Sequence, residues 1–217
     1  MKDNVIEAIN KYKIIAIIRG IEKNKLINTV EALYKGGIRL VEVTYSADGS
    51  VSDEQTADSI KMLSEYFEGR LFVGAGTVLH AHQVLLTAKS GGRFIISPDT
   101  KEDVIKKANE LSLVSIPGAL TPTEIVQAHE YGADYVKLFP AANLKADYVK
   151  AISAPLSHIK LLAVGGIDTN NIPEYIKAGV CGFGIGSNIV DKKIIDDGNY
   201  EALCRLARKY VKVIDNE

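Results

Sequence analysis

The stretch "LTPTEIVQAHEYGADYVKLFP", residues 120–140, contains one complete unit of a helix followed by a strand. Thr121 predicts a helix N-cap, the proline after it suits the first helical position, and Glu124 completes a capping box. Gly132 is placed to end that helix in a left-handed conformation. The apolar run at 135–139 then indicates a short buried strand.

The same unit recurs along the whole chain. Gly36, Gly91 and Gly179 follow amphipathic stretches and are predicted, like Gly132, to end helices in a left-handed conformation. The apolar runs start about 20 to 30 residues apart, the spacing of a βα unit. Eight runs are predicted strands: "IIAIIR" from Ile14, "RLVEVTY" from Arg39, "LFVGAGT" from Leu71, "RFIISP" from Arg93, "LVSIPGA" from Leu113, "DYVKLFP" from Asp134, "KLLAVGG" from Lys160 and "CGFGIGS" from Cys181.

Eight buried strands that alternate with helices predict a parallel sheet covered on its outside. We therefore expect an α/β fold, a single (β/α)8 TIM barrel domain over residues 1–217, with extra helices at 3–11 and 200–213. An open doubly wound sheet is the rival fold. The sequence has no G-x-G-x-x-G after the first run to support it.

Bulk composition excludes several classes of partner. The 217 residues are 47% hydrophobic and carry a formal net charge of −1, which argues against nucleic-acid or membrane-surface binding. Cys181 and Cys204 form neither a disulfide framework nor a metal-ligand spacing. The first residues lack the apolar region of a signal peptide, so we expect a cytoplasmic protein with reduced thiols.

Lys137 lies inside an apolar strand, where a lysine is seldom buried without a partner. Active sites of TIM barrels lie at the carboxyl ends of the strands. Apolar neighbours disfavour the ammonium form, which would leave a nucleophilic amine able to attack a ketone. A lysine that reaches the barrel mouth or pairs with a carboxylate is the structural alternative.

Glu42 is a second charge inside an apolar strand, in "LVEVTY". The strands of Glu42 and Lys137 are both even-numbered, so their inward side chains can share a layer across a barrel. A carboxylate that faces an amine can move protons during imine formation and carbon–carbon cleavage. A structural ion pair between Glu42 and Arg19 is the alternative.

Glycine-rich loops follow the last two strands, in "AVGGID" and "GIGSNIV". TIM barrels often bind phosphate there through backbone N–H groups. The predicted phosphate-binding residues are Gly165, Gly166, Gly184, Gly186 and Ser187.

Thr77, at the end of "VGAGT", is placed either to donate its hydroxyl to a carboxylate or carbonyl or to cap a helix. His80 and His82 are two positions apart, so on a helix they would point to different faces and could not share a metal. We predict no metal site.

These residues and their order resemble the class I 2-keto-3-deoxy-6-phosphogluconate (KDPG) and 4-hydroxy-2-oxoglutarate (KHG) aldolases over nearly the whole chain. The resemblance implies a homotrimeric barrel that needs neither a metal nor an organic cofactor. It assigns Lys137 as the Schiff-base lysine and Glu42 as the general acid/base, and places Arg19 and Thr77 in the active site, Thr77 at the pyruvate carboxylate. It also places Gly165, Gly166, Gly186 and Ser187 at the phosphate. The segments that carry it are "IIAIIRGI", "GGIRLVEVT", "VGAGTV", "FIISP", "PGALTPTE", "VKLFPA", "VGGI" and "GIGS".

Two positions depart from the gluconate-type pattern. Ser46 lies in "TYSADGS", a segment where those members carry an arginine, so carboxylate binding must differ. Val164 replaces a threonine before the paired glycines, a feature shared with 2-keto-3-deoxy-6-phosphogalactonate aldolases. Loss of that hydroxyl removes a hydrogen bond that could distinguish the two C4 epimers.

The resemblance thus implies cleavage of a phosphorylated 2-keto-3-deoxy sugar acid, with the gluconate as the first substrate and 4-hydroxy-2-oxoglutarate as a further one. The galactonate epimer is an alternative. Two other functions stay open: a phosphosugar isomerase or synthase in which Lys137 only clamps an anion, and a sugar-phosphate sensor in which Lys137 and Glu42 are a structural pair.

Overall fold

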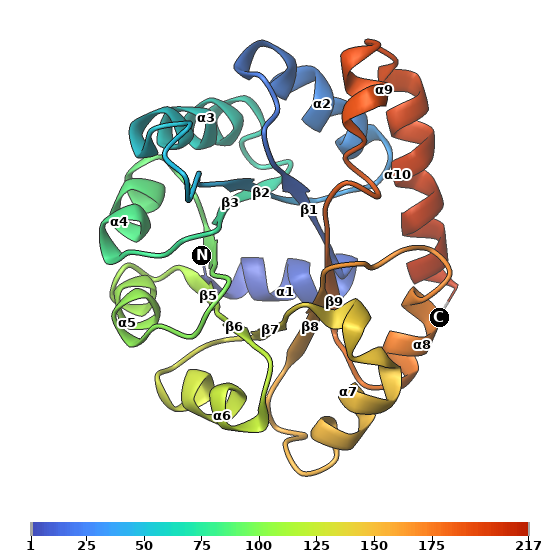
Figure 1. Cartoon of the computed structure of the whole chain (residues 1–217). Coiled ribbons are helices and arrows are strands. Elements are labelled where there is room, and N and C mark those ends of the chain that lie inside the picture. The colour runs from blue at the N-terminus through green and yellow to red at the C-terminus, as the bar shows by residue number, and fades with distance from the viewer. Residues whose placement is uncertain (1, 217) are drawn as a thin grey trace.

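The computed structural model describes residues 2–216 and has nine parallel strands surrounded by helices (Figure 1). Because each strand is a short β-branched or apolar run, each is buried on both faces, as parallel strands in α/β proteins are. The strands are β1 (Ile14–Ile18), β2 (Leu40–Thr44), β3 (Phe72–Gly76), β4 (Phe94–Ile96), β5 (Val114–Ile116), β6 (Gly118–Ala119), β7 (Val136–Leu138), β8 (Leu161–Val164) and β9 (Gly182–Ile185).

The strands form one sheet in the order β5-β4-β3-β2-β1-β9-β8-β7-β6. β5 and β6 are two pieces of the fifth predicted run, separated at Pro117, which has no N–H to donate. The Tyr135 N–H donates to the Ser115 carbonyl at 3.3 Å and the Lys137 N–H to the Pro117 carbonyl at 2.8 Å. These bonds join the two ends of the sheet, so the predicted (β/α)8 barrel is confirmed with its fifth strand in two pieces.

Helices surround the strand ring, and α1 lies across its middle (Figure 1). α1 and α10 are the two extra helices that the sequence predicts. No helix among residues 2–216 is long and apolar enough to span a bilayer. The helices are α1 (Lys2–Tyr12), α2 (Lys23–Lys35), α3 (Asp53–Tyr66), α4 (Ala81–Lys89), α5 (Glu102–Glu110), α6 (Pro122–Glu130), α7 (Lys145–Ser153), α8 (Ile172–Lys177), α9 (Lys192–Asp196) and α10 (Tyr200–Asp215), with a 3-10 turn, η1, at Ala141–Asn143.

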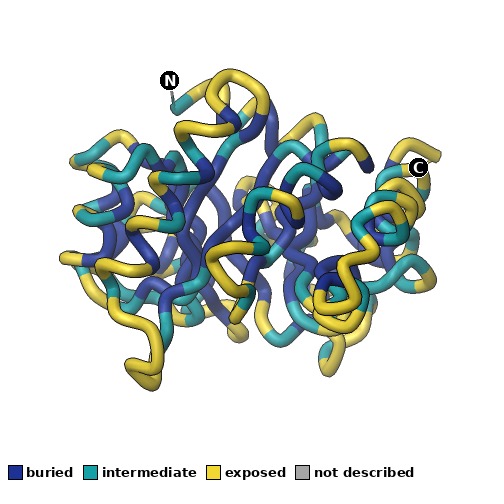
Figure 2. The backbone as a smooth tube through the Cα atoms, turned by 90° about the horizontal axis from the view of Figure 1, so that it is seen from above, coloured by how far each residue is buried: buried dark blue, intermediate teal, exposed yellow. Residues whose placement is uncertain are grey.

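The core has two layers. The larger layer lies between the strands and the outer helices, and the smaller fills the barrel and reaches α1, which closes one end. Buried backbone therefore runs through the centre while exposed backbone lies on the outer turns (Figure 2). The smaller layer consists of Val5, Ala8, Ile9, Ile15, Leu40, Phe94, Ile96, Val114, Ile116, Tyr135 and Leu162.

The capping box of α6 and three of the four predicted helix-ending glycines follow the sequence signals, whereas the helix predicted to start from Thr100 has Lys101 as its N-cap. Thr121 and Glu124 form the predicted capping box of α6. Gly91, Gly132 and Gly179 have positive φ, as predicted. Gly36 was the wrong residue for the end of α2: its φ is −75°, and the left-handed residue is Gly37 at 107°. Two adjacent glycines offered the same freedom, and a Cβ on Gly36 would meet Ala207 of α10, so close packing explains Gly36 instead.

Candidate active site

Lys137 and Glu42 both lie inside the barrel. Lys137 is on β7 and 7% exposed, and Glu42 is on β2 and 2% exposed. Because strand side chains alternate, each shares a face with the core residue two positions before it, Tyr135 and Leu40 respectively. The ammonium and the carboxyl group therefore lie above the apolar core layer, toward the carboxyl ends of the strands.

The two groups perturb each other and are perturbed by burial. Burial raises the pKa of Glu42 from its ordinary 4.5 to about 7, and the positive charges of Lys137 and Arg19 only partly oppose that rise. Burial also lowers the pKa of Lys137, Glu42 opposes this, and Arg19 reinforces it. Within the described residues no hydrogen bond joins Glu42 Oε2 to any partner. The site thus holds a carboxyl group able to gain or lose a proton near neutral pH.

Phe139 borders the lysine on its open side. Lys137 Nζ lies 4.5 Å from the centroid of the Phe139 ring, which is 39% exposed. An aromatic face stabilises the ammonium form. The sequence contained no sign of this contact beyond the adjacency of an aromatic residue in "KLF".

Gly76 makes the space that Glu42 occupies. It is the last residue of β3, and a Cβ built on it would overlap Glu42 Oε1 and lie 2.7 Å from Glu42 Cδ. Its φ is not positive, so the backbone itself would accept alanine. Gly76 therefore leaves the space that Glu42 needs, which the sequence analysis missed.

We expect Gly76→Ala to lower kcat about 10²-fold, because a shift of about 1 Å in a catalytic group has effects of that size. Gly74→Ala is the matched control: it lies on the same strand, and its Cβ would overlap the ring of Phe94 in the apolar core. Steady-state kinetics and thermal unfolding of both variants separate the two effects. An equal loss of kcat in both variants would show that Gly76 only supports packing.

Arg19 and Thr77 lie together at the barrel mouth. Arg19 follows β1, and its Nη2 donates to Thr77 Oγ1 at 3.2 Å. The Arg19–Glu42 ion pair, which was the structural alternative for Glu42, does not occur among residues 2–216, although Arg19 acts on Glu42 through its charge. Thr77 is not a helix cap, since α4 has His80 as its N-cap. Its φ is 55°, a conformation that costs a β-branched residue about 1–3 kcal/mol.

The loop after β2 brings a carboxylate to this mouth. A cavity of about 430 Å³ is lined by Arg19, Thr77, Ser46 and Asp48, among others. Hydrogen bonds from Ser46 and Ser50 lower the pKa of Asp48 to about 2, so it is ionised at neutral pH. This segment therefore presents hydroxyls and a negative charge, and Arg19 is the cation among these four residues.

The two glycine loops are adjacent and have free N–H groups. Gly165 and Gly166 follow β8 with φ of 95° and 72°. Asn188 Nδ2, in the loop after β9, donates to the Ile167 carbonyl at 2.8 Å and so links the two loops. Among residues 2–216 the N–H groups of Gly166 and Ser187 donate no hydrogen bond. Such unused donors suit a phosphate.

Val164 and Gly184 form the wall below these loops. Val164 ends β8 and is 5% exposed, and it is paired in register with Gly184 of β9. A Cβ on Gly184 would lie 2.8 Å from Val164 Cγ2, so this glycine supports side-chain packing rather than a ligand.

The histidines differ from their predicted arrangement. His80 and His82 stack with ring centroids 5.5 Å apart, because His80 precedes α4 instead of lying on it. The prediction that they point to different faces was wrong. No group of three or more His, Cys, Asp or Glu residues suited to a metal occurs among residues 2–216.

A larger cavity of about 840 Å³ lies at the opposite end of the barrel, where β2, β3 and β4 begin. It is lined by Arg39, Arg70 and Arg93, among others, and by none of the predicted site residues. Lys137 and Glu42 lie toward the other end, where the strands finish.

Comparison with known proteins identifies the family of the chain. Residues 5–206 match the family described as "KDPG and KHG aldolase". The chain is 31% identical to 2-dehydro-3-deoxy-phosphogluconate aldolase of Haemophilus influenzae, over 97% of this chain and 96% of that protein. It is 34% identical to 2-dehydro-3-deoxy-6-phosphogalactonate aldolase of Escherichia coli, over 82% and 85% of the two chains.

A solved structure is similar in fold as well as in sequence. It is KDPG aldolase from Legionella pneumophila with pyruvate captured as a covalent carbinolamine intermediate. The two folds match with a TM-score of 0.83 at 28% identity, over 93% of this chain and 95% of that one. With a buried lysine and carboxyl group at the mouth of the same barrel, this chain belongs to the KDPG and KHG aldolase family of carbon–carbon lyases.

Proposed function

We propose that this protein is a class I aldolase that cleaves 2-keto-3-deoxy-6-phosphogluconate to pyruvate and glyceraldehyde 3-phosphate through an imine on Lys137. One observation carries the proposal: a buried lysine whose pKa is lowered shares the barrel interior with a carboxyl group whose pKa is about 7. The lysine supplies the amine nucleophile, and the carboxyl group moves protons at neutral pH.

Imine formation comes first. The neutral Nζ of Lys137 attacks the C2 ketone, and the resulting carbinolamine loses water to give a protonated imine. Glu42 donates the proton that the departing hydroxyl needs and is left as a carboxylate. Its pKa of about 7 suits both forms.

Carbon–carbon cleavage follows. Glu42 removes the C4 hydroxyl proton, the C3–C4 bond breaks, and its electron pair moves into the protonated imine to give an enamine. Glyceraldehyde 3-phosphate leaves, the enamine is protonated at C3, and hydrolysis releases pyruvate and free Lys137. With 4-hydroxy-2-oxoglutarate the same steps give pyruvate and glyoxylate.

The remaining residues bind the two ends of the substrate. Arg19 and Thr77 receive the carboxylate next to the ketone, which is supported by their contact at the mouth. The phosphate binds to Gly165, Gly166, Gly186 and Ser187, which is supported by the free N–H groups of two of them. Because the phosphate is remote from the reacting bond, its binding energy serves to hold C4 beside Glu42.

Reductive trapping tests the proposal. The protein is incubated with pyruvate and borohydride, its intact mass is measured, and the modified peptide is mapped. A pyruvate-sized adduct on Lys137 is the expected result. A folded protein that turns over a phosphosugar without an adduct would favour an isomerase or synthase, and binding without turnover would favour a sensor.

The galactonate epimer is a second candidate substrate, favoured by Val164. This buried side chain ends β8 directly before the paired glycines and offers no hydroxyl to the substrate. We expect Val164→Thr to shift the ratio of kcat/KM for the two epimers about tenfold toward the gluconate, the effect of one hydrogen bond. Val164→Ala changes the volume without adding a hydroxyl; an equal shift in that control would contradict the hydrogen-bond explanation.

We infer further that the enzyme is a cytoplasmic homotrimer that needs no metal or organic cofactor. The family resemblance supports the trimer, and the free thiols of Cys181 and Cys204 agree with a reducing compartment. Light scattering of the purified protein tests the oligomeric state, and full activity after treatment with a chelator tests the independence from metal.

A further inference from the structure

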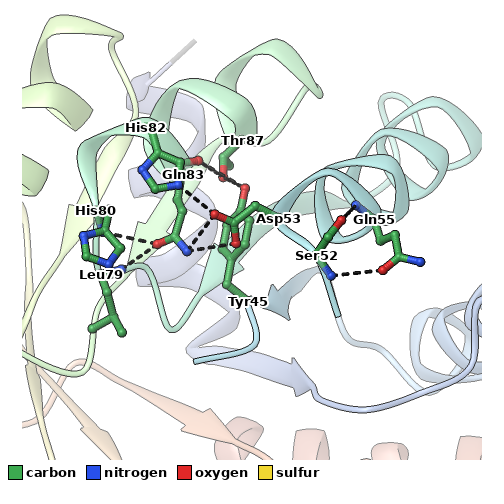
Figure 3. Close-up of polar contacts among 9 residues, drawn as sticks. All are labelled: Tyr45, Ser52, Asp53, Gln55, Leu79, His80, His82, Gln83 and Thr87. Carbon is green, nitrogen blue, oxygen red and sulfur yellow. Dashed lines mark hydrogen bonds and ion pairs between the residues drawn. The ribbon is translucent and has the colours of Figure 1, made fainter. Parts of the chain in front are cut away.

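A polar network behind the barrel mouth joins the loop that carries Thr77 to the start of α3 (Figure 3). Gln83, on α4, is 5% exposed and is the centre of this network. Its Oε1 accepts from the N–H groups of Leu79 at 2.8 Å and His80 at 3.2 Å. Its Nε2 donates to the two carboxylate oxygens of Asp53 at 3.0 and 3.2 Å. The carbonyl oxygen and the amide nitrogen of the Gln83 side chain are thus both hydrogen-bonded.

Asp53 is itself held in place. It is the first residue of α3, directly after the capping residue Ser52, and Ser52 and Gln55 form a complete capping box. His82 Nε2 lies 2.7 Å from Asp53 Oδ2 on the outer side. The carboxylate that orients Gln83 therefore stands on a fixed helix end.

Tyr45, directly after β2, connects that strand to α4. It is 3% exposed, and its hydroxyl donates to the Gln83 carbonyl at 3.1 Å and lies 3.0 Å from Thr87 Oγ1. Its N–H donates to the Gly76 carbonyl at 2.9 Å. The segments after β2 and β3 are thus connected both at the backbone and through α4.

Hydrogen bonds fix the backbone on both sides of Thr77, the residue with the left-handed conformation. The Gly76 carbonyl is fixed on one side of Thr77. On the other side the Val78 N–H donates to the Ile96 carbonyl at 3.2 Å, and the next N–H, that of Leu79, donates to Gln83 Oε1. A left-handed conformation of a β-branched residue persists only where its surroundings impose it. The Gln83 side chain holds the backbone that follows Thr77, through the N–H groups of Leu79 and His80.

We propose that Gln83, oriented by Asp53, is a positioning residue that holds Thr77 in the conformation that binds the substrate carboxylate. Gln83 does not touch the reacting atoms, and the inference rests on the proposed role of Thr77 at that carboxylate. The carboxylate is bound in both the ground state and the transition state. Loss of the support should therefore raise KM more than it lowers kcat.

An exchange of the two side-chain functions tests this proposal. Gln83→Glu places two carboxylates against each other, and we expect KM to rise about tenfold with kcat within about threefold. In Asp53→Asn/Gln83→Glu the new amide donates to the new carboxylate, whose other oxygen still accepts from Leu79 and His80. The KM of the double variant should return to within about threefold of the KM of the unsubstituted protein.

Two further variants keep the result interpretable. Asn199→Ala removes the N-cap of α10, does not involve a residue that lines the mouth cavity, and should lower the unfolding temperature without changing KM. If Gln83→Glu does not fold, Asp53→Ala removes the partner of Gln83 without adding charge and should raise KM about threefold. The inference would be overturned by an unchanged KM in folded Gln83→Glu or in folded Asp53→Ala. It would also be overturned if the KM of the double variant stayed as high as that of Gln83→Glu.

Pyruvate titration with borohydride separates this inference from the proposed function. If the starting protein forms no adduct, the imine mechanism is wrong. If the starting protein forms the adduct and Gln83→Glu needs the same pyruvate concentration for half-maximal labelling, only the positioning role is wrong. The expected result is an adduct in both proteins, with about tenfold more pyruvate needed by the variant.

Discussion

Lys137→Met is expected to lower kcat/KM for aldol cleavage by at least about 10⁴-fold and to abolish reductive trapping by pyruvate, while the barrel stays folded. Without the amine no imine forms, and the C3–C4 bond has no electron sink, so the loss is that of an essential nucleophile. Methionine keeps the unbranched shape of the buried stem beside Phe139.

The same substitution should not destabilise the protein. Burial lowers the pKa of Lys137, which means that the folded state disfavours the ammonium relative to the unfolded state. Between the lowered pKa and the ordinary 10.5, the unfolded chain binds the extra proton, so stability rises with pH through that window. An uncharged side chain removes this penalty.

Lys160→Met is the matched control for Lys137→Met. Lys160 precedes β8 at the opposite end of the barrel, with its Nζ 5.4 Å from the Tyr135 ring centroid. We expect full activity and normal trapping in this control. Trapping that persists in Lys137→Met, or a strong loss of stability in it, would contradict the assignment of Lys137.

Most of the fold could be predicted because its signals are local. Each strand lies within a mostly apolar run, and the capping box at Thr121 and Glu124 lies within four residues of sequence. The choice of Gly37 over Gly36 depends on a neighbour from another element, since a Cβ on Gly36 would meet Ala207 of α10. Such tertiary preferences override local propensity.

The residues of the candidate site also fall into those that the sequence pattern reveals and those that it does not. Lys137 and Glu42 could be recognised because a charge inside an apolar run conflicts with its surroundings, and such conflicts cluster at functional sites. Gly76 serves Glu42 by lacking a side chain, and it lies 34 positions away along the chain. Gln83 acts through three elements that meet only in the folded protein. Neither role has a signature in the sequence.

Glu42→Gln should separate catalysis from stability. We expect kcat to fall about 10³-fold or more, because glutamine neither accepts the C4 hydroxyl proton nor donates one to the departing water. The amide keeps the size of the side chain within the space left by Gly76. Imine formation with pyruvate should be slowed and still reach the Lys137 adduct.

Glu42 should also make the stability of the protein depend on pH, and Glu42→Gln should remove that dependence. Burial raises the pKa of Glu42 from 4.5 to about 7, a difference that corresponds to about 3 kcal/mol at 1.36 kcal/mol per pKa unit. Between pH 4.5 and about 7 the folded protein holds a proton that the unfolded chain has released, so stability falls as pH rises through this window. Glutamine has no such dependence.

Urea unfolding of both proteins at pH 5 and pH 8 measures this effect. At pH 5 the carboxyl group is protonated in the folded state, and the two proteins should differ little in their free energy of unfolding. At pH 8 Glu42→Gln should be the more stable by up to about 3 kcal/mol, since the raised pKa already includes the attraction of Lys137 and Arg19 for the carboxylate. A less stable variant at pH 8 would mean that the ionised Glu42 and Lys137 stabilise each other, as a structural pair would. A more stable and inactive variant would show that the carboxyl group is buried at a cost in stability because the reaction requires it there.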